Sequence, residues 1–114
     1  MKLKNRVIDG VVVVQVEGKL VGGADSDTLH DYMKELLAAG HRKFVMNLKK
    51  VPWADSRGIG MLIGAHTSVK NEDGRLVLSN ISDRIDSILT LTRLLLIFKT
   101  FDSEKEAIAH LTGD

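Results

Sequence analysis

Residues 44–65 read FVMNLKKVPWADSRGIGMLIGA, and this stretch decides the fold. Its first five residues form an apolar run with the length and composition of a buried strand. Residues 49–52 indicate a turn, and a helical pattern then opens at Asp55 and Ser56. The stretch therefore predicts a strand, a loop and a helix whose N-terminus carries a serine.

The start of this predicted helix is suited to an anion. The first turn of a helix has backbone N–H groups without intrahelical partners, and the helix dipole adds partial positive charge there. An anion on Ser56 would therefore be stabilised. Gly58 and Gly60 have no side chains, so a partner can approach the backbone closely. Gly60 and Gly64 share a helix face, which predicts close packing of that face on a sheet or a neighbouring helix.

The N-terminal part of the chain predicts a β-hairpin. Residues 3–8 and 11–16 are two β-rich runs. The Asp9-Gly10 pair between them is typical of a two-residue turn, because both residues accept positive φ angles. The chain is therefore expected to begin with two antiparallel strands.

An amphipathic helix is predicted after the hairpin. Asp25 or Ser26 is expected to cap its N-terminus, and Gly40 to end it. Its apolar residues recur at three- and four-residue spacing: Leu29, Tyr32, Met33, Leu36 and Leu37. This spacing indicates a helix that covers a sheet.

The remaining elements follow the same alternation. Residues 76–78 predict a buried strand, Ser82 caps a further helix, and residues 94–98 predict another strand. Ser103 and Glu106 form a capping box at the start of a last helix. Strands that alternate with helices after a hairpin predict an α/β fold with a mainly parallel sheet of four or five strands and about four helices.

Composition narrows the classes of function. The 114 residues are 44% hydrophobic and 27% charged, as expected for one domain over residues 1–114. The absence of cysteine excludes disulfides, a thiol nucleophile and cysteine metal sites. A net charge of +1 gives no electrostatic case for nucleic acid or membranes. With no apolar run near the roughly 20 residues of a membrane span and no signal peptide pattern, we expect a cytoplasmic protein.

The segment VMNLKKVPWADSRGIGML at residues 45–62 resembles the STAS domains, and among them the bacterial anti-sigma factor antagonists. The family pattern is an aliphatic strand ending in Asp/Asn-Leu, followed by Asp-Ser-small-Gly-Leu/Ile-Gly at the opening of a helix. The order and spacing of the predicted elements fit the family over nearly the whole chain. The resemblance therefore implies a single STAS-like domain.

In the family, the serine after the aspartate is phosphorylated, which carries over here to Ser56. The resemblance implies a switch without enzymatic activity of its own. Unphosphorylated, it binds an anti-sigma factor with serine kinase activity and so frees a sigma factor. Phosphorylation of Ser56 blocks this binding, and a PP2C-like serine phosphatase reverses it. No cofactor is implied, and a weak homodimer is compatible with the resemblance.

The partner-binding surface implied by the resemblance is the helix start and the neighbouring loops: Gly22, Gly23, Trp53, Asp55, Ser56, Arg57, Gly58, Ile59, Gly60 and Met61. Core packing is the expected role of Trp53, although a tryptophan near a docking surface can also be a binding hot spot. Helical geometry is expected to expose either Ile59 or Met61, and we favour Met61.

Two departures from the family pattern stand at this surface. Position 57 is Arg, where the family usually has a small residue. After the second strand the family often reads Gly-x-Leu-Asp, whereas here residues 18–20 run into Val21-Gly22-Gly23. In the family this loop lies beside the phosphorylation site, so the surface that a partner meets is expected to differ here.

Simpler interpretations of these residues stay open. Asp55 and Ser56 are both residue types that cap helices, and composition alone favours a capping role for Ser56. The resemblance reverses that preference. An exposed Arg57 is more often a solvated charge than a phosphate clamp.

Other classes of site lack their signatures. The four histidines do not have metal-ligand spacing, so no metal site is expected. Asp25, Asp27 and Asp31 lack the glycine and distal glutamate of a calcium-binding loop. Residues 18–23 lack the Gly-Lys-Ser/Thr ending of a phosphate-binding loop, and Lys49-Lys50 is too short a basic run for nucleic acid.

Two alternatives to the switch belong to other classes. The first is a STAS module that is not phosphorylated and acts as a scaffold or ligand-binding subunit of a larger assembly. Arg57 and the loop at 21–23, both unlike typical antagonists, motivate it. The second is a small serine hydrolase, against which the chain lacks a Gly-x-Ser-x-Gly motif and a histidine near Ser56 in sequence.

Overall fold

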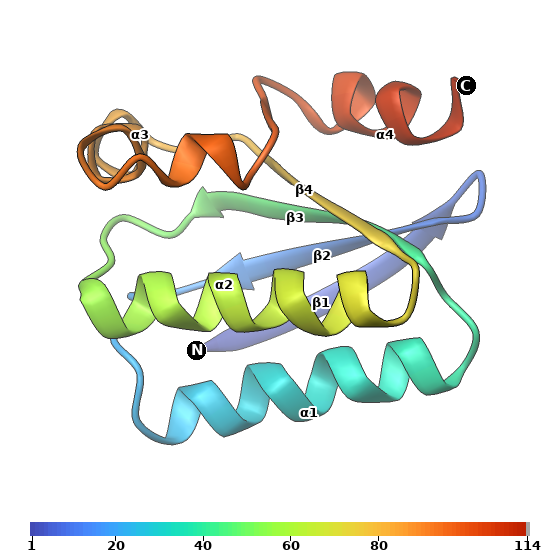
Figure 1. The fold of residues 1–114 in the computed structure, drawn as a ribbon, viewed down its shortest axis with the longest axis horizontal. Helices are drawn as coiled ribbons and strands as arrows, with labels where there is room; N and C mark the ends of the chain where they lie inside the picture. Colours follow the sequence, from blue (N-terminus) through green and yellow to red (C-terminus); the bar gives the residue numbers. More distant parts are fainter. Residues whose placement is uncertain (114) are drawn as a thin grey trace.

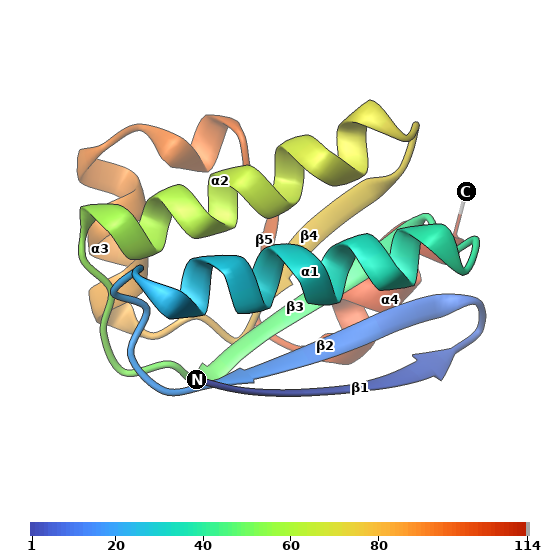
Figure 2. The same cartoon turned by 90° about the horizontal axis from the view of Figure 1, so that it is seen from below.

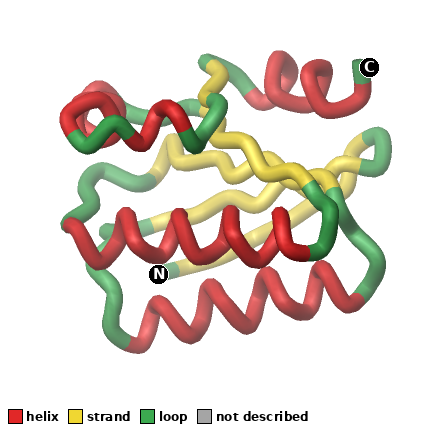
Figure 3. The backbone as a smooth tube through the Cα atoms, in the orientation of Figure 1, coloured by secondary structure: helices red, strands yellow, loops and turns green. Residues whose placement is uncertain are grey.

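The computed structural model describes residues 1–113. Its elements in chain order are β1 (Lys2–Ile8), β2 (Val11–Glu17), α1 (Ala24–Ala38), β3 (Lys43–Lys50), α2 (Ser56–Asn71), β4 (Arg75–Ser79), α3 (Asp83–Leu91), the short 3₁₀ helix η1 (Leu94–Leu96), β5 (Thr100–Phe101) and α4 (Glu104–Thr112). Figure 3 shows the strands gathered in one sheet with helices around it. The α/β fold predicted from the sequence is confirmed.

The five strands lie in the order β1-β2-β3-β4-β5. The pair β1 and β2 is antiparallel, and every other pair is parallel. Asp9 (φ 51°) and Gly10 (φ 78°) form the turn of the hairpin, as predicted. The mainly parallel sheet follows from the helices that connect β2 to β3 and β3 to β4.

Helices cover both faces of the sheet. α1 and α2 lie side by side on one face, and α4 lies on the other (Figures 1 and 2). The two faces are separated by strand alternation, since Val12 and Val14 of β2 join the larger core while Val11 and Val13 join the smaller one. α3 lies at the end of the sheet where β3 leads into α2 (Figure 1).

The start of α1 differs from the prediction. The N-cap is Gly23, without a side-chain hydrogen bond, so the expected cap at Asp25 or Ser26 is wrong. Gly22 and Gly23 have φ angles of 84° and 70°, and this glycine turn leads the chain directly into the helix. Gly40, with φ 100°, ends α1 as predicted.

The strand predicted at residues 94–98 is also wrong. α3 ends in a left-handed turn at Arg93 (φ 61°), and η1 follows it. Leu96 is exposed and Phe98 is buried in the larger core, while pairing with β4 begins at Thr100. In this run, Phe98 and partly buried Leu94 pack on the larger core, whereas Leu96 and Ile97 are exposed.

The caps of α3 and α4 follow local sequence more closely, whereas α4 is anchored by contacts with distant strands. Ser82 caps α3 and Ser103 caps α4, each accepting from a backbone N–H three residues later. Glu104, the first residue of α4, pairs with Arg6 of β1 and accepts from the side-chain amide of Asn47.

Among the helices of residues 1–113, none is both long and apolar enough to cross a membrane.

Candidate functional site at the start of α2

Asp55 caps α2, and Ser56 is its first residue. The Oδ1 atom of Asp55 accepts from the N–H of Gly58 at 2.9 Å. The capping role that composition favoured for Ser56 therefore belongs to its neighbour. Ser56 is exposed, and its hydroxyl forms no hydrogen bond with the rest of residues 1–113. The hydroxyl is thus accessible to another protein.

The charges around Ser56 are partly balanced. The hydrogen bond from the Gly58 N–H lowers the pKa of Asp55, and Arg57 adds to this effect. Nη2 of Arg57 lies 3.2 Å from Oδ2 of Asp55. Arg57 is 69% exposed, which fits the solvated charge expected from the sequence. Asp55 is therefore an anion at neutral pH, with a cation beside it.

The loop after β2 runs along the loop before α2. The N–H of Leu20 donates to the carbonyl of Trp53 at 3.0 Å, and the N–H of Asp55 donates to the carbonyl of Leu20 at 3.1 Å. The N–H of Gly18 bonds the carbonyl of Lys50 at 3.1 Å. The two loops are thus held together by backbone hydrogen bonds. The expectation that this loop lies beside Ser56 is confirmed.

Two glycines allow these segments to pack. A Cβ atom on Gly58 would lie 1.8 Å from the carbonyl oxygen of Leu20, so the helix can approach the loop only without a side chain there. A Cβ atom on Gly22 would lie 2.8 Å from Cβ of Arg57. The glycine in the loop therefore makes room for Arg57. Arg57 and the loop that contains Gly22, the two departures from the family pattern, are therefore in contact with each other.

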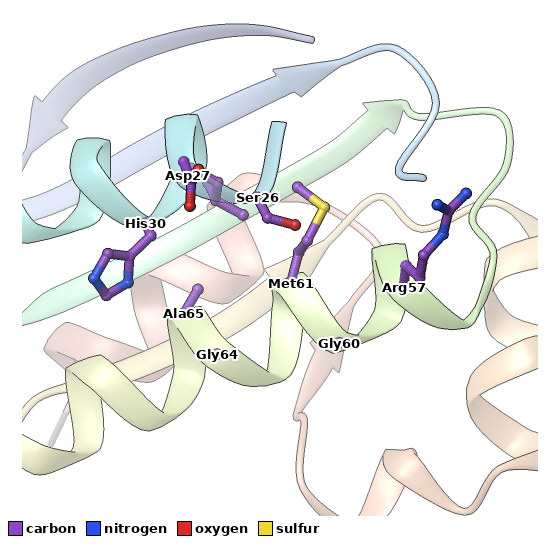
Figure 4. A pocket seen from close by; sticks show the side chains of 9 residues that line it. Ser26, Asp27, His30, Arg57, Gly60, Met61, Gly64 and Ala65 are labelled. Carbon is purple, nitrogen blue, oxygen red and sulfur yellow. The ribbon is translucent and has the colours of Figure 1, made fainter. Parts of the chain in front are cut away.

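The other glycines of α2 lie in open space. A Cβ atom on Gly60 or Gly64 would meet nothing within 4 Å, so the prediction of close packing on this face is wrong. Both line a hollow of about 290 Å³ between α1 and α2, together with Ser26, Asp27 and Arg57 (Figure 4). α2 therefore packs on the rest of the fold through residues next to the face that carries Gly60 and Gly64.

Ile59 and Met61 are 5% and 7% exposed. The expectation that Met61 is exposed is therefore wrong. α2 lies against the sheet on one side and against α1 on another, so two of its faces are covered. In Figure 4, Met61 points from α2 toward Ser26 of α1.

Trp53 is 36% exposed, so its predicted role in the core is also wrong. It lines a hollow of about 300 Å³ with Lys19, Pro52 and Arg84. Lys19 comes from the loop after β2, and Arg84 from α3. The exposed indole thus shares a hollow with two cations next to the start of α2.

The predicted partner-binding residues come together at one end of the molecule, but they differ in exposure. Gly23, Trp53, Ser56, Arg57 and Gly60 are exposed, Asp55 is half-buried, and Gly22, Gly58, Ile59 and Met61 are buried. Sequence reasoning missed Lys19 and Arg84. Arg84 has no local signal, because it lies 28 positions beyond Ser56 in the chain and reaches the site only through folding.

The carboxylate nearest to Ser56 is engaged by its neighbours. Across residues 1–113, no group of three or more His, Cys, Asp or Glu side chains could hold a metal ion. The carboxylate of Asp55 already accepts from Gly58 and Arg57. The site therefore presents an exposed hydroxyl next to a carboxylate that is already hydrogen-bonded.

The family model of the STAS domain matches residues 2–107. The chain belongs to the STAS domain family. This STAS domain is 24% identical over 103 residues to the anti-sigma F factor antagonist of Paenibacillus polymyxa, covering 90% of this chain and 87% of the relative.

Solved structures share the fold of this STAS domain. An anti-sigma factor antagonist from Mycobacterium paratuberculosis has a TM-score of 0.83 at 19% identity, over 96% of this chain and 92% of that one. The Bacillus cell fate determinant SpoIIAA, solved in its phosphorylated form, has a TM-score of 0.71 at 20% identity, over 96% and 98%.

Proposed function

We propose that this STAS domain is an anti-sigma factor antagonist controlled by phosphorylation of Ser56. The unphosphorylated form binds an anti-sigma factor that is also a serine kinase, and a sigma factor is released. Phosphorylation blocks the binding, and a PP2C-like serine phosphatase restores it. In this scheme the protein is a substrate of the kinase and catalyses no reaction itself.

The observation that carries the proposal is the exposure of Ser56 directly after the Asp55 cap. A kinase must reach the hydroxyl, and the exposed first residue of α2 permits this. Relatives in the family include a named anti-sigma F factor antagonist, and the similar SpoIIAA has a phosphorylated form. These findings support the switch.

Electrostatics explains how a phosphate could act without refolding the domain. A phosphoryl group adds a charge of about −1.5 to −2 and three acceptor oxygens. The N-terminus of α2 and the guanidinium of Arg57 favour this charge, while Asp55 opposes it. The fold is therefore retained, and the docking surface changes its charge. About 3 kcal/mol of differential binding is enough for a switch of more than a hundredfold.

The docking surface in this proposal extends from Ser56 to the hollow at Trp53. A half-exposed tryptophan and an arginine are residue types that often dominate binding energy at interfaces. Trp53 and Arg84 lie in this hollow beside Lys19. We expect Trp53→Ala to weaken binding to the anti-sigma factor by about tenfold or more.

The first experiment is intact-mass analysis of the protein purified from its own host, with peptide mapping. Added mass of one phosphoryl group on the peptide that contains Ser56 is the expected result. An unmodified Ser56 under every growth condition would instead favour a STAS module that is not phosphorylated and serves as a scaffold or ligand-binding subunit.

The second experiment separates the effect of a negative charge at position 56 from the effect of losing the Ser56 hydroxyl. Ser56→Ala is expected to bind the kinase partner constitutively, and Ser56→Asp is expected not to bind. Ser87→Asp is the control, because it adds the same charge to the exposed surface of α3. The partner is first captured from host lysate with Ser56→Ala and identified, and then affinities are measured by calorimetry. Equal affinities of the two Ser56 variants would reject the mechanism.

A further inference from the structure

A second hollow lies away from Ser56, at the other end of α2. Its volume is about 280 Å³. Five basic side chains line it: His66, Lys70, Arg75, Lys99 and His110. They come from α2, β4, the segment before β5 and α4, so the fold gathers them from four places in the chain. An apolar surface of Leu76, Val77 and Ile97 completes the lining.

The charge of this hollow is not a consequence of overall composition. The whole chain has a net charge of only +1, yet Lys70, Arg75 and Lys99 are all cationic at neutral pH. No Asp or Glu is among the lining residues. No salt bridge within residues 1–113 involves these three cations. A cleft lined by charges of one sign concentrates the electrostatic field and attracts counter-ions.

Two donors of the hollow are held in place by contacts. Nη2 of Arg75 lies 3.0 Å from Nε2 of His110. The ring of His66 packs edge-on against Phe98, with 5.3 Å between ring centroids. Its Nδ1 atom is buried without a hydrogen-bond partner within residues 1–113. Burial lowers the pKa of His66, and the charge of Lys70 lowers it further.

The edge of the sheet is open at the same place. β5 contains only two residues, and its pairing with β4 begins at Leu78. Arg75, Leu76 and Val77 therefore have no strand partner on the side of β5. A ligand can therefore approach the exposed Arg75 at this edge, where a longer strand would have covered it.

We propose that this basic hollow, defined by His66, Lys70, Arg75, Lys99 and His110, binds a small ligand that carries a phosphate group. Three cations are more than enough to neutralise a phosphate dianion, and a guanidinium can bind its oxygens in a bidentate manner. Ile97, the exposed apolar residue of the lining, can contact a short organic part of a phosphomonoester. The inference does not depend on the function of Ser56.

An NMR titration of the ¹⁵N-labelled protein tests the proposal. The probes are inorganic phosphate and glycerol 3-phosphate, each at matched ionic strength, with glycerol and sodium chloride as references. Saturable shifts are expected at the amides of Lys70, Arg75, Leu76 and Lys99. A bound anion is also expected to raise the pKa of His66, which ring resonances report. Tighter binding of glycerol 3-phosphate would identify a phosphomonoester, and tighter binding of inorganic phosphate would identify the free ion.

Matched variants distinguish a site from general attraction of anions. Lys70→Gln and Arg75→Gln are each expected to weaken binding by about tenfold, as for a lost hydrogen bond to a charged group. Lys34→Gln removes the same charge from the exposed face of α1 and is expected to leave binding unchanged. Shifts without saturation, shifts spread over basic residues elsewhere, or equal weakening by Lys34→Gln and Lys70→Gln would overturn the proposal.

Discussion

Two glycines of α2, two positions apart, have opposite surroundings. A Cβ atom on Gly58 would collide with the backbone of Leu20, whereas a Cβ atom on Gly60 would lie in open space. We expect Gly58→Ala to destabilise the protein by about 1–3 kcal/mol or more, because backbone must move. Gly60→Ala is expected to stabilise it by about 0.5–1 kcal/mol, since alanine favours the helix.

Urea denaturation of the two variants and the parent protein measures these changes. Gly60→Ala is the control for the effect of alanine in α2, so the difference between the variants reports the contact with Leu20. If Gly58→Ala were as stable as Gly60→Ala, the close approach of the loop to α2 would be wrong.

We expect His66 to make the stability of the folded protein depend on pH. Burial lowers its pKa in the folded state, while the unfolded chain has a pKa of about 6.5. Between these two pKa values the unfolded state binds more protons than the folded state. The contribution of His66 to stability is therefore full above about pH 6.5 and declines as the pH falls toward the lower pKa of the folded state. The urea midpoint is therefore expected to be lower at pH 5 than at pH 7.5.

His66→Gln is expected to reduce this difference between the two pH values. His30→Gln, on the exposed surface of α1, serves as the control and is expected to retain it. An undiminished pH dependence in His66→Gln would assign the effect to other groups.

At the scale of elements, side-chain caps define where α3 and α4 begin. The hydroxyl of Ser82 accepts from the N–H of Ile85 at 3.2 Å. Ser82→Ala is expected to cost about 0.5–2 kcal/mol of stability. Thermal unfolding compared with Ser87→Ala, a change on the exposed side of the same helix, provides the measurement. Equal melting temperatures would show that the cap contributes nothing to the stability of α3.

Elements that depend on local chemistry could be predicted from the sequence. The Asp9-Gly10 turn, the cap at Ser82 and the end of α1 at Gly40 each involve residues a few positions apart. The strand predicted at 94–98 is wrong, because the composition of this run allows both a strand and a compact turn. Contacts with the core, at Phe98 above all, decide between them.

Within the candidate site, too, features set by neighbouring residues could be predicted, and features set by distant parts of the chain could not. The position of Ser56 at the helix start follows from neighbouring residues and was predictable. The burial of Met61 depends on α1, and the position of Arg84 depends on α3, so neither could be seen in the local pattern. The fit of Arg57 to the loop glycine likewise needs the two loops placed side by side.

For the whole molecule, the two faces of the sheet are unequal. The face under α4 contains a small core in which Ala107 and Leu111 are the buried residues of the helix. Leu111→Ala is expected to cost about 2–3 kcal/mol, near the lower end for a buried leucine. It is also expected to increase hydrogen exchange in α4 more than in α1 or α2, since those helices pack on the larger core.

Leu111→Ile conserves volume and is the matched control, with an expected cost below about 1.5 kcal/mol. Hydrogen exchange followed by mass spectrometry measures both variants. A uniform increase across the chain would show that α4 and the larger core unfold as one unit.

The contact between Gly22 and Arg57 has a consequence for the evolution of this domain. Because a Cβ atom at position 22 would lie 2.8 Å from Cβ of Arg57, position 22 cannot acquire a side chain while position 57 keeps one in the same place. A lineage that acquires a side chain at position 22 is expected either to place glycine at position 57 or to move the loop away from α2. Across diverging sequences, the two positions should therefore coevolve as a pair, although 35 residues separate them in the chain.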